Sequence, residues 1–129
     1  ELSSDDVDAI LFTGGWNGND GSDTRFAFDN TLNKQAKAFV QEMLRNDKPV
    51  GAVCGGIAVL ARAGLINGKN VANCRYIDQD VKIESGAIWS AELEKDSDAI
   101  VVKDGLIITG GNSINCQEIC QRLMSALNR

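Results

Sequence analysis

One short segment constrains the fold of this chain more than any other: an apolar strand that stops at a cysteine and is followed at once by an apolar helix. The segment reads Val50-Gly51-Ala52-Val53-Cys54-Gly55-Gly56-Ile57-Ala58. Its first four residues suit a strand that is buried on both faces of a parallel sheet. The small residues around Cys54 allow a sharp turn between strand and helix. The sequence therefore predicts a corner that presents Cys54 at the carboxyl edge of a sheet.

Cys54 is a candidate nucleophile because of this corner. Ala52 and Gly56 lie two residues before and after it, which is the spacing of a nucleophile elbow with sulfur in place of oxygen. The start of the helix would place unpaired N–H groups beside the sulfur, and such donors favour the reactive thiolate. The alternative is that Cys54 is a small buried hydrophobic residue, because free cysteines are usually buried and inert. The local sequence leaves these two interpretations balanced.

The rest of the hydrophobic pattern predicts an α/β protein. We expect further strands at residues 9–12, 70–73, 99–102 and 106–109, with the first one buried on both faces. Asp104-Gly105 between the last two predicts a hairpin. Helices are expected between Asp29 and Pro49, at residues 55–63, near 78–83 and at about 115–127. This order of elements favours an α/β sandwich with a mainly parallel sheet.

Composition excludes several classes of function. Of the 129 residues, 43% are apolar and 24% are charged, which is typical of a globular domain. The net charge of −5, without a basic cluster, argues against nucleic acid or an anionic membrane as partner. No apolar run approaches the roughly 20 residues of a membrane span, so we expect a cytoplasmic protein. The chain has no histidine, and a Cys-His or Ser-His pair therefore cannot form within it.

The four cysteines predict neither a disulfide scaffold nor a metal site, because they lack the paired CxxC spacing of zinc ligands. Cys116 and Cys120 are four residues apart in the last predicted helix, on the same face as its apolar residues Ile119, Leu123, Met124 and Leu127. Packing into the core is the favoured interpretation for both. Reduced thiols are expected throughout, with no cofactor.

Four segments occur in an order that resembles a known family. They are Thr13-Gly14-Gly15, then residues 48–56 around Cys54, then residues 60–69, and then Val101 to Asn112 with Gly110-Gly111 near its end. This series resembles the ThiJ/PfpI superfamily, which includes the Parkinson-linked protein deglycase and the PfpI intracellular proteases. The resemblance implies a flavodoxin-like three-layer sandwich with a mainly parallel sheet. It covers residues 1–129 as a single domain that lacks the first strands and helix of the family.

The resemblance also implies roles for particular residues. Cys54 takes the position of the nucleophile, and the backbone N–H groups of Gly15 and Gly55 would form an oxyanion hole. Asn112 matches a loop near the same pocket. The polar loop from Trp16 to Asp23 does not have the spacing of a calcium loop. It is either a rim of the pocket with Trp16 as a wall, or a plain solvated loop.

Three departures from the family pattern restrict these expectations. Gly55 stands where many members have histidine, which argues against a PfpI-type protease. Cys74 stands where some members have another histidine, and this position implies a site beside Cys54. Cys74 is then either a resolving thiol or a chance cysteine at a sheet edge, and the sequence favours the latter. The family's glutamate that hydrogen-bonds the cysteine belongs to a segment before Glu1, so we expect residues to be missing there.

Two classes of function stay open from the sequence. The first is an enzyme of the deglycase or glyoxalase kind, a hydrolase or lyase in which the Cys54 thiolate attacks a small carbonyl compound. The second is a redox sensor or chaperone-like member without catalysis, because fold alone does not settle activity. A small-molecule substrate and a homodimer are what the resemblance implies for partners.

Overall fold

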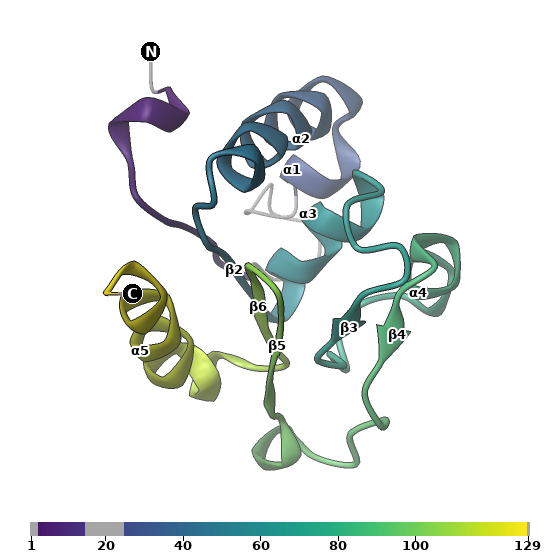
Figure 1. The fold of residues 1–129 in the computed structure, drawn as a ribbon. Coiled ribbons are helices and arrows are strands. Elements are labelled where there is room, and N and C mark those ends of the chain that lie inside the picture. Colours follow the sequence, from purple (N-terminus) through teal and green to yellow (C-terminus); the bar gives the residue numbers. More distant parts are fainter. Residues whose placement is uncertain (1–2, 15–24, 129) are drawn as a thin grey trace.

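The computed structural model describes residues 3–14 and 25–128 (Figure 1). The strands are β1 (Ile10–Phe12), β2 (Val50–Val53), β3 (Asn70–Val71), β4 (Ile88–Trp89), β5 (Val101–Asp104) and β6 (Ile107–Gly110). The helices are α1 (Arg25–Phe28), α2 (Asn30–Arg45), α3 (Ile57–Arg62), α4 (Gln79–Ser85) and α5 (Cys116–Leu127). None of the described helices is both long and apolar enough to cross a membrane.

A four-stranded sheet in the order β1-β2-β6-β5 forms the centre of the fold. β2 runs parallel to β1 on one side and to β6 on the other, with Val50 opposite Ile107 and Val53 opposite Gly110. β5 and β6 are antiparallel and form the hairpin that Asp104-Gly105 predicted. The expected flavodoxin-like α/β fold with a mainly parallel sheet is therefore confirmed.

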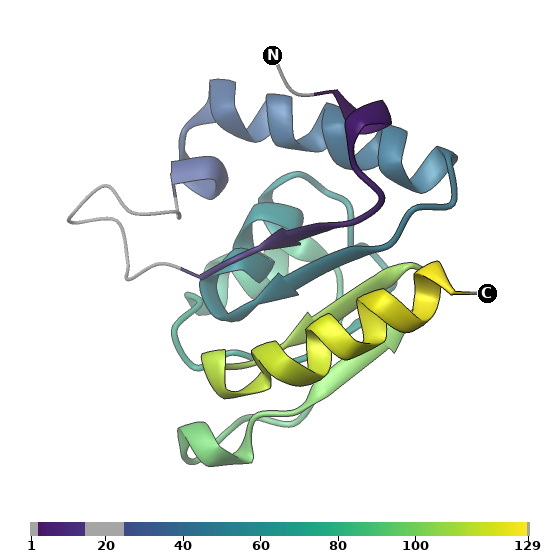
Figure 2. The ribbon, with the colours of Figure 1, turned by 90° about the vertical axis from the view of Figure 1, so that its left-hand side faces the viewer.

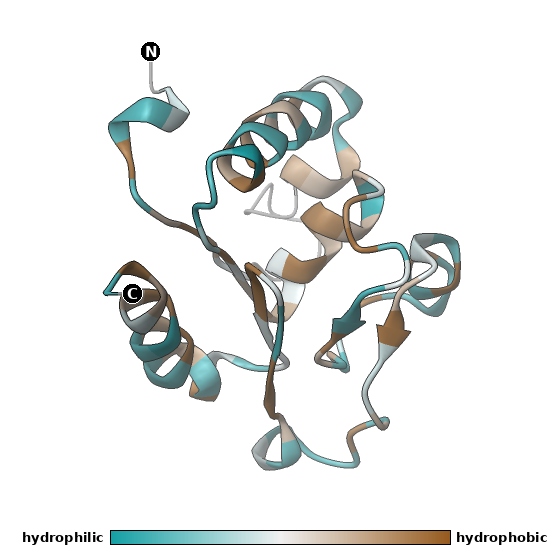
Figure 3. Ribbon diagram, in the orientation of Figure 1, coloured by the Kyte–Doolittle hydropathy of each residue, from teal (hydrophilic) through white to brown (hydrophobic). Residues whose placement is uncertain are grey.

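Helices cover both faces of this sheet. α5 packs on one face against β2 and β6, while α2 and α3 pack on the other face against β2 (Figures 1 and 2). Residues Ile57 to Ala61 of α3 are all buried, so this helix is enclosed by its neighbours. Hydrophobic residues accordingly dominate the central strands and α3, whereas α2 and α4 carry many hydrophilic positions (Figure 3). β2, which is buried at every position, lies in the middle of this core.

Two burial predictions are wrong. β1 is only half-buried, because it is the edge strand of the sheet and not a strand with neighbours on both sides. α5 buries only Ile119 and Leu123, while Cys120 is exposed and Met124 retains 59% of its accessible surface. A helix on the outside of a sheet buries one stripe of side chains, so core packing applies to the half-buried Cys116 but not to Cys120.

A second, two-stranded sheet places the segment that contains Cys74. β3 and β4 are parallel and lie beside the β5–β6 hairpin. The N–H of Ala72 donates to Oγ1 of Thr109 at 2.8 Å, and the N–H of Asn70 donates to the Asp104 carboxylate at 2.8 Å. These side-chain acceptors replace a continuous ladder, which explains why β3 is shorter than the predicted strand 70–73. The chain that follows β3 is thereby fixed next to the end of β6.

A close backbone crossing fixes how α3 starts. A Cβ atom added at Gly56 would lie 2.2 Å from the carbonyl oxygen of Phe12, at the end of β1. The backbone of Gly56 is helical, with φ −61° and ψ −25°, so its conformation alone does not require glycine. Glycine is required there because β1 and α3 approach too closely for a side chain.

The variant Gly56→Ala tests this crossing. Helix propensity alone would make alanine more stable by about 1 kcal/mol. Since the overlap is with backbone, which cannot rotate away, we expect a net loss of about 1–3 kcal/mol in the free energy of unfolding. Urea denaturation followed by circular dichroism measures it.

Gly64→Asn is the matched control for that variant. Gly64 has φ +71° with no atom within 4 Å of an added Cβ, and asparagine tolerates this conformation. Its stability should stay near that of the wild type. A Gly56→Ala protein as stable as the wild type would mean that the crossing is wider than described.

Candidate active site

The corner after β2 is strained in the way that a nucleophile elbow requires. Val53 is extended (φ −127°), Cys54 has φ +53°, and a 3-10 turn over Cys54–Gly56 leads into α3. In the described part of the chain, Cys54 and Asp47 are the only non-glycine residues with positive φ. This conformation costs an L-residue about 1–2 kcal/mol, so it persists only where the surroundings impose it.

The end of β1 imposes this conformation. A Cβ atom added at Gly14 would lie 2.8 Å from Cβ of Cys54 and 2.8 Å from the backbone nitrogen of Gly55. Gly14 thus contacts one side of the corner, while Gly56 contacts Phe12 on the other. The two glycines let β1 press directly on the turn. Sequence reasoning identified Gly56 but did not assign this role to Gly14, although Gly14 belonged to one of the four family-like segments.

The sulfur of Cys54 faces a second sulfur. Sγ of Cys74 lies 3.7 Å from Sγ of Cys54, and the Cys74 thiol donates a hydrogen bond to it. The backbone N–H of Gly55 donates to the same sulfur. Cys54 is half-buried, whereas Cys74 has no accessible surface. The position beside Cys54 that the resemblance implied for Cys74 is therefore where the structure places it.

These contacts divide the two thiols into a thiolate and a proton donor. The hydrogen bond from Cys74, followed by the one from the Gly55 N–H, lowers the pKa of Cys54 to about 7, although burial opposes this shift. The same hydrogen bond, together with burial, raises the pKa of Cys74 far above the ordinary thiol value. We assign the charge to Cys54 because it is the sulfur that solvent can reach and that has two donors.

The carboxylate of Asp96, which has Tyr76 and Arg75 as partners, opposes this ionisation. Asp96 accepts a hydrogen bond from the Tyr76 hydroxyl at 2.9 Å and forms an ion pair with Arg75 at 3.2 Å. Its negative charge raises the pKa of Cys54 and so offsets some of the lowering by the two hydrogen bonds. The guanidinium of Arg75 lies against the same carboxylate and compensates some of that charge. The sequence did not predict this group, because Asp96 is far from Cys54 in the sequence and lies near it only in the folded chain.

Of the other predicted site residues, Gly55 lies at the Cys54 sulfur, whereas Asn112 has a structural contact of its own. Gly55 is buried, and its N–H points at the Cys54 sulfur. Asn112 is 9% exposed, and its amide oxygen accepts the Ile114 N–H at 3.1 Å, which makes it the cap of the turn before α5. No hydrogen bond in the described residues joins Asn112 to Cys54. Gly15 and Trp16 lie outside the described residues.

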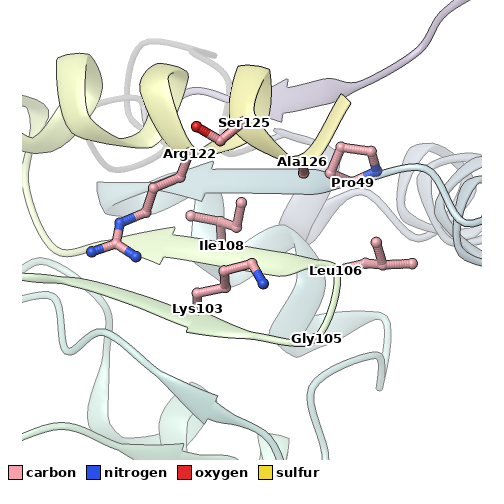
Figure 4. Close-up of a pocket in the computed structure, with 8 residues that line it drawn as sticks. All are labelled: Pro49, Lys103, Gly105, Leu106, Ile108, Arg122, Ser125 and Ala126. Carbon is pink, nitrogen blue, oxygen red and sulfur yellow. The ribbon is translucent and has the colours of Figure 1, made fainter. Parts of the chain in front are cut away.

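Two cavities among the described residues are lined by other residues than Cys54. One of about 630 Å³ lies between α5 and the β5–β6 hairpin, with Pro49, Lys103 and Arg122 among its lining residues (Figure 4). Pro49 precedes β2 and Cys54 follows it, so this cavity is at the opposite end of the strand from the cysteine. A recess of about 360 Å³ lined by Asn73, Lys82 and Trp89 is closer in sequence to Cys74.

Residues 3–14 and 25–128 contain no group of three or more His, Cys, Asp or Glu side chains arranged to hold a metal ion. What they do contain is an activated thiolate with a neighbouring thiol and a backbone donor. This arrangement suits nucleophilic attack by sulfur.

Comparisons with known proteins agree with the geometry. The profile of the DJ-1/PfpI family matches residues 1–126. The chain is 32% identical over 105 residues to deglycase TK1284 of Thermococcus kodakarensis, covering 81% of this chain and 53% of that protein. It is 34% identical over 101 residues to YraA of Bacillus subtilis, a protein named as a proposed cysteine protease. That match covers 78% of this chain and 51% of YraA. The chain thus spans about half the length of these relatives.

A solved structure agrees as well. A two-domain protein from Anabaena variabilis, with DJ-1/ThiJ/PfpI-like and ferritin-like domains, superposes with a TM-score of 0.71 at 26% identity. The match covers 99% of this chain and 32% of that one.

The pH dependence of alkylation tests the assignment of the thiolate. The rate of Cys54 alkylation by iodoacetamide should rise with pH through a midpoint at about pH 7 and then level off, because only the thiolate reacts. In Cys74→Ala the midpoint should move up towards the ordinary value of 9.0, since the main donor is lost. Cys74→Ser keeps a donor and should shift less. Mass spectrometry of the tryptic peptide 46–62 measures the rate. Unchanged midpoints in both variants would contradict the role of Cys74.

Removing the Asp96 charge should act in the opposite direction. Asp96→Asn deletes a negative charge near the thiolate and leaves Arg75 unpaired, and both changes lower the pKa of Cys54. The shift should be smaller than that of Cys74→Ala, because Asp96 and Arg75 are solvent-exposed and screened. Asp98→Asn, in the same 3-10 turn, is the control. A midpoint that rises in Asp96→Asn, or moves equally in both variants, would refute the electrostatic argument.

Proposed function

The chain belongs to the DJ-1/PfpI family, and we propose that it acts on small carbonyl compounds through the thiolate of Cys54. The observation that carries the proposal is the corner itself, where an imposed φ of +53° presents a sulfur whose pKa is near 7. At neutral pH a larger fraction of this thiol is then ionised than of an ordinary cysteine. The relative named a deglycase supports carbonyl chemistry as the reaction class.

The first chemical step is addition of sulfur to the carbonyl carbon. A bond forms between Sγ of Cys54 and that carbon, the carbonyl π pair moves to the oxygen, and a proton taken up by the oxygen gives a hemithioacetal. As the bond forms, the sulfur loses its negative charge and no longer competes for hydrogen bonds. The Gly55 N–H, which donates to the thiolate in the resting site, is then available for the developing oxyanion. Such a donor stabilises the transition state more than the free substrate.

Burial supports a small substrate. The corner lies between the end of β1 and α3, with Gly14 and Gly56 in contact with the backbone around it. Cys54 itself is only half-exposed, and Cys74 closes the side towards the second sheet. An aldehyde or a 1,2-dicarbonyl compound is compact enough to approach such a sulfur.

Peptide hydrolysis has less support. YraA shares 34% identity with the chain, but a protease of the Cys-His kind needs an imidazole, and the 129 residues contain none. The residue after the nucleophile is Gly55, which supplies only its backbone. An imidazole base for peptide hydrolysis would have to come from outside this sequence.

Methylglyoxal is the substrate with which to test the proposal. The wild-type protein should consume it, and Cys54→Ser should lose all but a background rate, as the alcohol at this site stays un-ionised. Cys120→Ser, which alters an exposed thiol on α5, should leave the rate unchanged.

A second measurement detects carbonyl addition without turnover. Methylglyoxal should slow iodoacetamide labelling of Cys54 far more than labelling of Cys120, because the hemithioacetal protects the sulfur that formed it. Equal turnover by wild type and Cys54→Ser, or the same fractional slowing of labelling at both cysteines by methylglyoxal, would rule out carbonyl chemistry at this residue.

A further inference from the structure

We propose that this chain also reduces hydroperoxides through a Cys54–Cys74 disulfide, in which Cys74 is the resolving thiol. The inference shares the Cys54 nucleophile with the proposed function but needs neither a carbonyl substrate nor an oxyanion hole. What carries it is the contact between the two sulfurs, which are 3.7 Å apart although their residues are separated by a helix and a strand.

The distance is short enough for a bond to form without refolding. A disulfide requires about 2.0 Å between its sulfurs, so the pair must approach by roughly 1.7 Å. Rotation of two short side chains about their Cα–Cβ bonds can supply much of this movement.

Both backbones are held firmly enough to keep the sulfurs in register. Cys54 is fixed by the crossing of β1 over its turn. On the other side, the N–H of Asn73 donates to Oγ of Ser90 at 2.8 Å, and its side-chain amide donates to the Ser90 carbonyl at 2.8 Å. The Lys82 ammonium also donates a hydrogen bond to the amide oxygen of Asn73 at 2.6 Å.

Accessibility separates the roles of the two thiols. A hydroperoxide from solvent can reach the half-exposed Cys54, but it cannot reach Cys74, whose accessible surface is zero. Cys74 therefore meets an oxidised sulfur only in the form of Cys54. A thiol with a single reactive neighbour and no access to solvent is suited to resolve that neighbour and to little else.

The chemistry balances with a dithiol as reductant. The Cys54 thiolate attacks the hydroperoxide, so that an S–O bond forms, the O–O bond breaks, and an alcohol or water leaves with a proton from solvent. The sulfur of Cys74 then displaces the hydroxyl of the sulfenic acid: an S–S bond forms, the S–O bond breaks, and the Cys74 proton leaves in water. An external dithiol reduces the disulfide by exchange and becomes a cyclic disulfide.

The order of events follows from the charges. While Cys54 is a thiolate, its charge and its hydrogen bond hold the proton on Cys74. Oxidation to the neutral sulfenic acid removes that charge, so Cys74 ionises more easily only after its partner has reacted. The resolving thiol is thereby activated by the product of the first step.

Peptide mapping provides a direct test. Reduced protein is treated with one equivalent of hydrogen peroxide, blocked with N-ethylmaleimide and cut with trypsin. Cys54 lies in the peptide 46–62, Cys74 in 70–75, and both Cys116 and Cys120 in 104–122. We expect the first two peptides linked, with the loss of two hydrogens, and 104–122 unoxidised although Cys120 is the exposed thiol. Dithiothreitol should restore both thiols and sustain repeated consumption of peroxide.

Cys74→Ser is the decisive variant, because it keeps a hydrogen-bond donor to Cys54 but cannot form the disulfide. The linked peptide should disappear, dimedone should trap a sulfenic acid on Cys54, and excess peroxide should carry that residue on to the sulfinic acid. Cys54→Ser should show neither product, and Cys120→Ser should behave as the wild type. Circular dichroism of each variant controls for folding.

The outcomes separate this inference from the proposed function. Wild-type protein that accumulates sulfinic acid at Cys54 without the linked peptide refutes the resolving role, even if methylglyoxal is consumed. Linked peptides in a protein that leaves methylglyoxal untouched support the disulfide and refute only the carbonyl chemistry. Oxidation that starts at Cys120 refutes the inference outright.

Discussion

The crossing of the end of β1 over the turn after β2 is the constraint on which the rest of this site depends. Phe12 and Gly14 press on a turn that has room for no side chain at Gly56, and this contact holds Cys54 at a φ of +53°. The cost of that conformation, about 1–2 kcal/mol, is small against the burial of β2 and α3, which make the turn unavoidable. Packing of the core thus maintains a strained residue at the edge of the sheet.

Ionisation of Cys54 is decided by local donors and not by a long helix. α3 has only six residues, and the groups that lower the pKa of Cys54 are the Cys74 thiol and the Gly55 N–H. These donors must outweigh burial and the charge of Asp96, both of which favour the neutral thiol. A balance of this kind leaves the pKa near 7, where the residue changes its protonation state within the physiological range and keeps good nucleophilicity.

Each of the two sheets positions one of the two cysteines. The four-stranded sheet holds Cys54 through β1 and β2, while the two-stranded sheet delivers Cys74 from the end of β3. Thr109 of β6 ties the two sheets together through the backbone of Ala72. Carbonyl addition needs only the first sulfur, and peroxide reduction needs both. A single corner can serve both reactions because each begins with the same thiolate.

The sequence alone determined the corner, the hairpin and the order of the longer strands and helices, but not α1 or β4. Each of the predicted elements depends on neighbouring residues: small residues around Cys54, Asp-Gly between two apolar runs, and apolar residues at strand or helix spacing. It also led to the family through segments that recur in order. Only the tertiary structure decided that β1 is an edge strand and that Cys120 is exposed, and it turned the position implied for Cys74 into a direct contact with Cys54. The same holds for the effect of Asp96 on the pKa of Cys54. Burial and contact depend on which elements pack together, and local spacing does not contain that information.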